Sequence, residues 1–455
     1  YGTGMILSIY KSGGNGSLVV DTNSRISLSN NDSGTSNTVF GKLAGDDLAA
    51  GGTLNTFIGE DAGHELKLGD GNIAIGYDAM DDSYINDTQD ALIVSNIFIG
   101  NNAGGGTWTT AASQYNIGIG VNTMDAAMNG ALSNTGVGYA SLSGLTEGDD
   151  NVALGAGSAN AISTGEDNVA IGSSAAVALT TGLRNVVVGA FAMDAADGAE
   201  NDNIAIGAHA MGDANHDDCQ KNVIIGSYAG DNIGANAFDN AVGIGYNALG
   251  AVLQNTASGV VAIGSSSLAA LTSGANTIAI GYESGNALTS QSHNTIIGHQ
   301  AGKLLTAADN VIIGSGAMDA STSSGGNVAI GKDAMGANST GVDYCVAIGY
   351  EALNTVNHAD ADGNIAIGYQ AQLSNDSGIA NTAVGYRALR VNVDGNYNTA
   401  IGHQALETFE AGSDGEGSNT AVGINALQAL TTGVRNTSVG SFSGDALTTG
   451  DRNVA

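Results

Sequence analysis

Short runs of acidic residues are the first candidates for chemistry in this sequence, because clustered carboxylates can bind Ca²⁺. The runs are Glu147–Asp150, Glu166–Asp167, Glu200–Asp202, Asp217–Asp218 and Asp360–Asp362. The last run is nearest to a calcium loop, but the EF-hand template needs a Glu where this chain has Ala371. We interpret the runs mainly as a solvated acidic surface that keeps the protein soluble. Asp360 and Asp362 are the Ca²⁺ candidates, and no other cofactor is expected.

Trp108, the single tryptophan, is the candidate for glycan contact. It lies beside Thr109 and Thr110 in the segment 104–115, which we expect to project from the fold, as we do segments 81–95 and 407–418. An exposed Trp ring could stack on a sugar, whereas a Trp folded over the core would act as a local plug. The sequence leaves both interpretations open.

Residues for nucleophilic or metal-assisted catalysis are not grouped in the sequence. Cys219 and Cys345 lie far apart, and the seven histidines never occur as His-x-x-x-His. Neither a Gly-x-Ser-x-Gly elbow nor a phosphate-binding P-loop is present. A polysaccharide-cleaving enzyme would need two carboxylates facing each other across a groove, and no pair among the 44 acidic residues stands out. We assign no catalytic residues and predict a non-enzymatic protein.

The composition and net charge of the chain exclude some classes of binding partner. The chain has 455 residues, with 12 basic residues against 44 acidic ones and a formal net charge of −32. This charge argues against nucleic acid, which requires a basic footprint, and against docking on anionic lipid. No apolar run approaches the ~20 residues that span a bilayer, so we expect no membrane insertion in this segment. The 70 glycines and the absence of proline indicate a regular architecture with little room for side chains.

A five-residue phrase, such as Asn168-Val-Ala-Ile-Gly172, recurs along nearly the whole chain. Aligned on its closing glycine, it has 23 complete copies from Gly41 to Gly440, at intervals of 16 to 24 residues. A further copy begins at Asn453 and stops at Ala455, so we expect the repeat to continue beyond this segment. The second residue is always Thr, Val or Ile, the fourth is nearly always Ile or Val, and the third is usually small. We expect a short strand whose second and fourth side chains fill the interior, with the third on the opposite face.

Asparagine opens 19 of the 23 copies, and stacked amides can form a hydrogen-bonded ladder along an axis. We predict a structural ladder that includes Asn72, Asn168, Asn185, Asn203, Asn327, Asn364, Asn381 and Asn398. The closing glycine should bend the chain or admit another backbone, a role that we predict for Gly76, Gly172, Gly189, Gly207, Gly331, Gly368, Gly385 and Gly402. Proline is absent because it would remove a ladder hydrogen bond.

These elements predict an all-β fold. A mean period near 18 is too short for pairs of helices and fits one coil of a parallel β-solenoid with about 23 coils of 16–24 residues. We place the solenoid at residues 37–455 and a β-rich lead-in segment at residues 1–36.

The phrase Asn381-Thr-Ala-Val-Gly-Tyr-Arg-Ala-Leu389 resembles the head repeat of trimeric autotransporter (YadA-like) adhesins. It is more similar to the longer version of this repeat in tail fibres and related structural proteins of tailed bacteriophages. The segment Asn23–Gly34 resembles the β-rich lead-in of such fibre proteins. The resemblance implies a left-handed β-roll and a homotrimeric rod. A few extra residues per coil depart from the shorter autotransporter repeat.

The resemblance also implies a function. It indicates a structural extracellular protein, the shaft or head of a virion tail fibre that supports host attachment. Its partners would be further copies of itself and a host-surface glycan or protein receptor. The alternatives are a bacterial cell-surface trimeric adhesin or extracellular filament subunit and, less favoured, a polysaccharide depolymerase tailspike.

Aromatic residues often follow the closing glycine. Tyrosine does so at Tyr77, Tyr139, Tyr246, Tyr282, Tyr350, Tyr369 and Tyr386, and histidine at His299 and His403. This column is either a glycan-binding strip or a ladder of planar side chains at one corner of the coil. The repeat fixes its register, which favours the ladder.

Overall fold

The computed structural model describes residues 36–49, 51–83, 93–108, 111, 113–217, 219–234, 238–251, 258–337, 341–356, 358–412 and 415–455, with the backbone of residues 19–20 and 26–27. These residues form strands and turns, and none of them is in a helix that could cross a bilayer. The chain divides into two units, Tyr1–Asn222 and Val223–Ala455. Most of the predicted lead-in and of the loop at residues 81–95 lies outside the described residues.

Unit 1 is a parallel β-solenoid in which each copy of the phrase forms a three-residue strand. The strands are β3 (Thr38–Phe40), β4 (Thr56–Ile58), β5 (Ile73–Ile75), β6 (Ile97–Ile99), β7 (Ile117–Ile119), β8 (Thr135–Val137), β9 (Val152–Leu154), β10 (Val169–Ile171), β11 (Val186–Val188) and β12 (Ile204–Ile206). Each strand pairs in register with the next, as Val169 does with Val186. Two further strands, β1 (Val19–Val20) and β2 (Ile26–Ser27), pair antiparallel.

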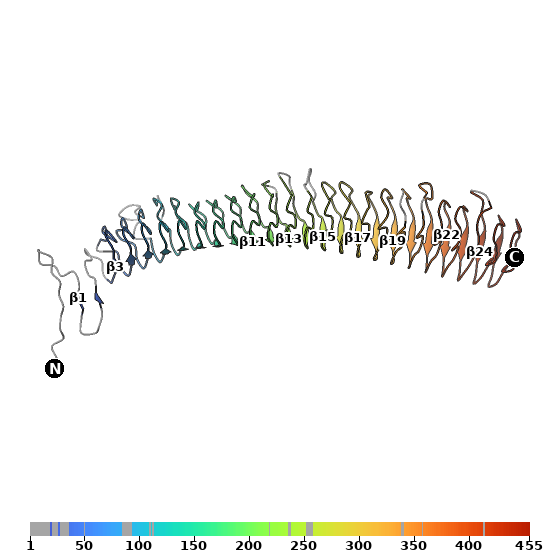
Figure 1. Ribbon diagram of the computed structural model, residues 1–455, viewed down its shortest axis with the longest axis horizontal. Helices are drawn as coiled ribbons and strands as arrows, with labels where there is room; N and C mark the ends of the chain where they lie inside the picture. Colours follow the sequence, from blue (N-terminus) through green and yellow to red (C-terminus); the bar gives the residue numbers. More distant parts are fainter. Residues whose placement is uncertain are drawn as a thin grey trace, which may run out of the picture. The chain divides into compact units, whose positions relative to one another are not determined.

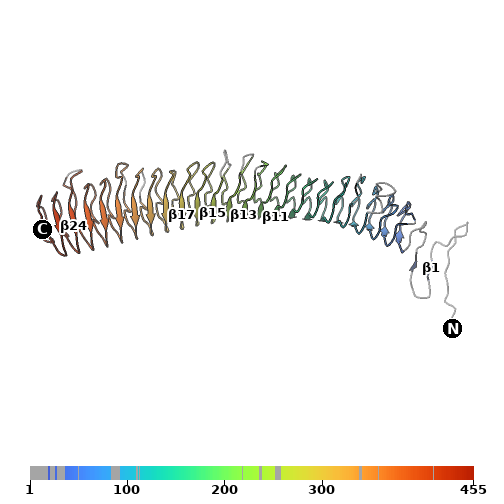
Figure 2. The same cartoon turned by 180° about the vertical axis from the view of Figure 1, so that it is seen from behind.

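Unit 2 repeats the same architecture. Its strands are β13 (Val223–Ile225), β14 (Val242–Ile244), β15 (Val261–Ile263), β16 (Ile278–Ile280), β17 (Thr295–Ile297), β18 (Val311–Ile313), β19 (Val328–Ile330), β20 (Val346–Ile348), β21 (Ile365–Ile367), β22 (Thr382–Val384), β23 (Thr399–Ile401), β24 (Thr420–Val422) and β25 (Thr437–Val439). Figures 1 and 2 show the strands of each unit side by side, with turns joining each strand to the next. The described residues thus form an all-β parallel solenoid, as the repeat predicts, with about 21 coils where about 23 were expected.

The predicted direction of the strand side chains is wrong. From β4 to β25 the third residue of the phrase is buried, and the second and fourth are half-buried or exposed. In β10, for example, Ala170 is 1 % exposed and lies between the more exposed Val169 and Ile171. The interior is narrow and accepts one side chain from each strand, which is why this residue is usually Ala or Gly. The β-branched residues therefore face outward.

In several coils with a large inner residue, a glycine four places after the closing glycine makes room for it. The ring of Phe57 lies where a Cβ on Gly63 would be, with ring carbons 2.8 Å from that position. Several coils with a small inner residue carry a long side chain there instead, as with Met80 beside Ala74. Both arrangements fill the interior to the density that folded cores require.

The closing glycine is required by two independent constraints. At Gly172 φ is +138°, a conformation that L-residues rarely adopt. A Cβ at this position would also lie 2.5 Å from the main-chain O of Gly189 in the next coil. The same two conditions hold at the predicted closing glycines Gly76, Gly189, Gly331, Gly368, Gly385 and Gly402, and Gly207 shares the positive φ.

Candidate functional site

The asparagines that open the phrase form a buried ladder of amides. The backbone N–H of Asn185 donates to Oδ1 of Asn168 at 3.0 Å, and its Nδ2 donates to the same oxygen at 3.0 Å. This Nδ2 also donates to the main-chain O of Glu200 at 2.7 Å. Asn203 makes the same two contacts with Asn185. Each rung satisfies backbone groups that would otherwise be buried without partners.

The other predicted ladder residues are placed in the same way in both units. Backbone N–H groups of Asn72, Asn327, Asn381 and Asn398 each donate to the side-chain oxygen of the asparagine one coil earlier. Asn364 differs, because its predecessor is Cys345. Its backbone N–H donates to Sγ of Cys345 at 3.3 Å. The amides hold the coils together and, since they are buried, they are not a binding surface.

Cys345 therefore occupies a rung of the ladder. Its own backbone N–H donates to Oδ1 of Asn327 at 2.8 Å, and the side chain is buried. Burial raises the pKa of the Cys345 thiol to about 12, so the thiol stays protonated and is a poor nucleophile. Cys219 is also buried and lies in the other unit, and neither residue is in a disulfide.

Several acidic residues hold backbone groups of the preceding coil rather than only facing solvent. Oδ1 of Asp149 accepts the N–H of Leu132 at 2.7 Å, and Oδ1 of Asp217 accepts the N–H of Ala199 at 3.1 Å. Burial raises the pKa of Asp149 above its usual range. The prediction of a merely solvated surface missed this role, although the recurrence of Asp or Asn two residues before the ladder position could have indicated it.

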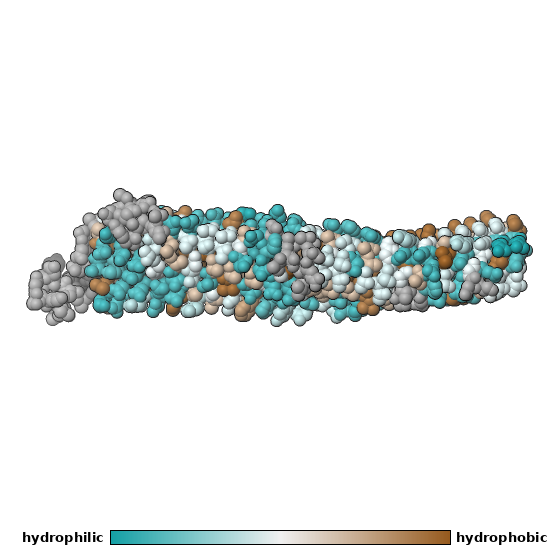
Figure 3. All heavy atoms as spheres, turned by 90° about the horizontal axis from the view of Figure 1, so that it is seen from above, coloured by the Kyte–Doolittle hydropathy of each residue, from teal (hydrophilic) through white to brown (hydrophobic). Residues whose placement is uncertain are grey.

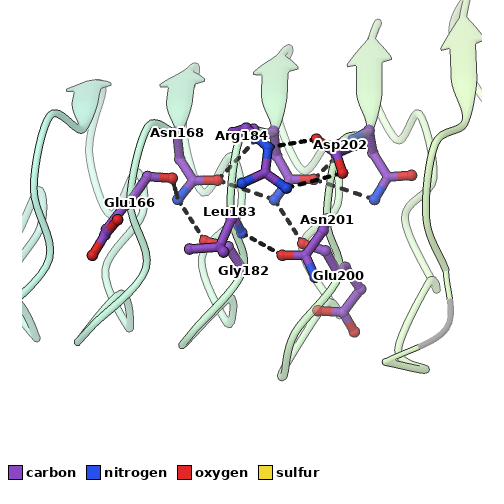
Figure 4. A network of polar contacts seen from close by, with 10 residues as sticks. Glu166, Asn168, Gly182, Leu183, Arg184, Glu200, Asn201 and Asp202 are labelled. Atoms are coloured by element: carbon purple, nitrogen blue, oxygen red, sulfur yellow. Dashed lines mark hydrogen bonds and ion pairs between the residues drawn. The ribbon is translucent and has the colours of Figure 1, made fainter.

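Glu200 is the most deeply buried of the acidic residues. It has no exposed surface, Oε2 accepts the N–H of Gly198 at 3.2 Å, and Oε1 has no partner among the described residues. Burial raises the pKa of Glu200. In Figure 4 its carboxyl group lies away from the amide ladder, on the turn side of the coil.

The two Ca²⁺ candidates point in different directions. The side chain of Asp360 is 81 % exposed, with Oδ2 3.7 Å from Nδ1 of His358. Oδ1 of Asp362 instead accepts the backbone N–H of Asp343 at 2.7 Å. Within the described ranges, no group of three or more His, Cys, Asp or Glu side chains is placed to hold a metal ion. Calcium binding by this pair stays a prediction.

Trp108 is a core residue. It is 2 % exposed, its Nε1 donates to the main-chain O of Gly104 at 3.1 Å, and its ring meets Phe98 edge-on at 6.2 Å between centroids. The indole offers no face to solvent on which a sugar could stack. This packing supports the plug interpretation. Thr109 and Thr110 lie outside the described residues.

The aromatic column is a stack of planar rings in its best-formed part. Tyr350, Tyr369, Tyr386 and His403 follow one another with centroids 5.0–5.3 Å apart and interplanar angles of 9–10°. The ring faces cover one another, and the three tyrosines are 38–40 % exposed. The faces that a sugar would need are used within the stack, so the geometry agrees with the ladder interpretation.

The feature that the sequence interpretation missed is the outward strand face. In each unit two columns of Ile, Val, Leu, Phe and Thr side chains run along this face, and no charged residue interrupts them. Its exposed members are Phe40, Ile58, Ile119, Val152 and Leu154 in unit 1, and Ile278, Ile365, Ile401 and Val439 in unit 2. The face drawn in Figure 3, by contrast, mixes hydrophilic and apolar residues. We call these paired columns the outward strand face.

Comparison with known proteins does not identify a family. No family model matches this chain, and no curated protein matches its sequence. The molecule is thus placed by its fold, the parallel β-solenoid, and by the chemistry of its surfaces.

Proposed function

We propose that this chain is a structural, non-enzymatic subunit of an extracellular fibre and that it works as a homotrimer. The outward strand face is the observation that carries the proposal. Monomeric proteins rarely expose a contiguous apolar patch of more than a few hundred Å², and larger patches are usually interaction sites. Because this face repeats in every coil, it would bury apolar surface over the length of each unit.

A further copy of the same chain is the partner that fits this face best. Nearly every coil presents a pair of β-branched side chains at the same spacing, so two copies in register would present matching rows. Homo-oligomers with closed symmetry are the common form of such self-association. The number three comes from the resemblance to YadA-like and tail-fibre repeats, as does the left-handed sense of the roll.

The amide ladder supports a mechanical role. It joins successive coils by side-chain hydrogen bonds in addition to the parallel strand pairing, so the scaffold resists local separation of coils. The net charge is −32 and the strand face is uncharged, so the acidic residues lie outside the strands. We therefore favour the shaft or head of a virion tail fibre.

The second candidate function is a bacterial surface adhesin or filament subunit. The observation that favours it is the aromatic stack at Tyr350–His403, which stays partly exposed at the edge of the strand face. In that case the ring edges and hydroxyl groups would meet a receptor from the side. Both candidates share the trimer and differ in whether this side of the solenoid binds a cell-surface molecule.

The oligomeric mass in solution tests the proposal. Light scattering after size-exclusion chromatography should give about three times the chain mass of 44.9 kDa. Replacing Val169 and Ile171 together by Lys places charge on the outward strand face and should dissociate the oligomer. Thr181→Lys adds a positive charge on an exposed turn instead and should leave the mass unchanged. A monomer at every concentration, or a face variant that keeps the full mass, would overturn the proposal.

A further inference from the structure

The amide ladder is interrupted over three consecutive coils of unit 2. Ala241, Val260 and Thr277 stand where most copies have asparagine, immediately before β14, β15 and β16. All three side chains are buried. The strands themselves stay paired in register across the interruption, as Val242 is with Val261. The coils here are therefore continuous, but they lack the side-chain rungs.

The interruption leaves backbone donors without acceptors. In the intact ladder, the N–H of Asn398 donates to Oδ1 of Asn381 at 2.8 Å. Ala and Val have no side-chain acceptor, and the hydroxyl of Thr277 turns to the main-chain O of Ala275 at 3.4 Å. Among the described residues, no hydrogen-bond acceptor is found for the backbone N–H groups of Val260, Thr277 and Asn294.

The single replacement at Cys345 shows what an isolated interruption does. There the sulfur takes over the role of the amide oxygen and accepts the N–H of Asn364 at 3.3 Å. No comparable substitute exists at Val260 or Ala241, whose side chains are hydrocarbon. The three-coil interruption thus differs from the replacement at Cys345, because it leaves buried backbone N–H groups without acceptors. Each missing amide also removes a side-chain hydrogen bond to the next coil.

We propose that the coils of β14–β16 are a built-in weak segment, at which unit 2 opens before the coils that carry an intact ladder. Local opening free energies differ along a protein and are lowest where hydrogen bonding and packing are poorest. In a solenoid, stability is a sum of contacts between neighbouring coils, so loss of rungs in three neighbours lowers the local stability without breaking the fold. This inference does not depend on the fibre proposal.

Residue-resolved amide hydrogen exchange under native conditions tests the proposal. The amides of Val260, Thr277 and Asn294 should exchange at least about tenfold faster than those of Asn310 and Asn327, which donate to ladder oxygens at 3.0 Å. Equal protection of the two sets would overturn the proposal.

A pair of variants at one position separates hydrogen bonding from packing. Thr277→Asn supplies an acceptor for the N–H of Asn294 and should slow exchange at Asn294 about tenfold. Valine is nearly isosteric with threonine, and Val260 already occupies the equivalent position one coil earlier. Thr277→Val supplies no acceptor and should leave exchange at Asn294 fast. If both variants behaved alike, the missing amide would not be the cause of the weakness.

Replacing a ladder asparagine by threonine should weaken a coil in an intact part of the ladder. Asn381→Thr removes the acceptor of Asn398 in an intact part of the ladder and should make the Asn398 amide exchange about tenfold faster. Unchanged exchange at Asn398 would contradict the proposal. Should this variant fold poorly, the Thr277 pair and the exchange map of the unaltered protein still decide the question.

Discussion

The ring of Phe98 fills the space that a side chain on Gly104 would need. An ideal Cβ on Gly104 would lie 2.8 Å from Cγ of the ring, although the two residues lie at different corners of the same coil. The neighbouring coil solves the same packing problem in the opposite way, with Gly118 on the strand and Met124 at the turn. In these two coils the large side chain is thus either on the strand or at the turn, and the other position is glycine.

This relationship predicts a rescue between the two positions. Phe98→Ala should lower the free energy of unfolding by about 3–5 kcal/mol, because a large buried ring is lost. Adding Gly104→Met should recover a substantial part of the loss. Met80 and Met124 already hold this position with φ of 53° and 50°, so the backbone accepts methionine there. Urea denaturation of the single and double variants measures both effects, and a double variant no more stable than Phe98→Ala would contradict the prediction.

The closing glycine should be intolerant of even one methyl group. Gly172→Ala introduces a side chain at φ +138° and 2.5 Å from a neighbouring carbonyl oxygen, and we expect a loss of at least about 2 kcal/mol. Gly363→Ala is the matched control. Its φ is +70°, but nothing lies within 4 Å of the added Cβ, so the loss should be about 1 kcal/mol. Thermal denaturation compares the two, and equal losses would mean that the close contact does not matter.

Cys345 should react with thiol reagents only when its coil opens. The raised pKa of about 12 and the burial of the side chain keep the thiol neutral and covered at pH 8. We expect slow labelling by a disulfide reagent in the native state and rapid labelling in urea. Cys345→Asn should restore the missing rung and add about 1 kcal/mol of stability, whereas Cys345→Ala should not. Rapid native labelling would show that this coil is open.

One exposed ion pair should give a pH-dependent contribution in unit 2. Hydrogen bonds from Lys303 Nζ at 2.7 Å and Gln300 Nε2 at 2.8 Å lower the pKa of Glu283 to about 2. A carboxyl group with a lowered pKa stabilises the folded state above its unfolded value of 4.5. That contribution is lost as the pH falls from about 4.5 to about 2. Carboxyl NMR titration measures the pKa, and Lys303→Met should raise it; an unchanged value would rule out Lys303 as the main cause.

Most of the fold can be predicted from the repeat phrase. The strand at each copy, the parallel register and the position of the amide ladder follow from Asn, β-branched residues and Gly recurring at one period. The direction of the strand side chains did not follow, because both faces of a three-residue strand are apolar here. In β10 it is Ala170 that lies inside, between the more exposed Val169 and Ile171, and the residue types alone do not decide this.

Individual side chains were less predictable than the repeat. Trp108 lies in a loop-like segment of variable length, yet it packs on Phe98 from the neighbouring strand, a contact that depends on the path of the chain rather than on its local sequence. The role of Asp149 likewise depends on the backbone N–H that faces it from the preceding coil. Such contacts join residues in different coils, and a local sequence pattern does not define them.

The in-register pairing of successive coils has a consequence for how this protein can change. The ladder step from Asn168 to Asn185 spans 17 residues, and the strands on either side of it present the same groups for pairing. Excision of this one coil would bring Val152 against Val186 with every type of contact preserved, whereas loss of a single residue would misplace a glycine. Gain or loss of whole repeats can therefore lengthen or shorten each unit in steps of one coil.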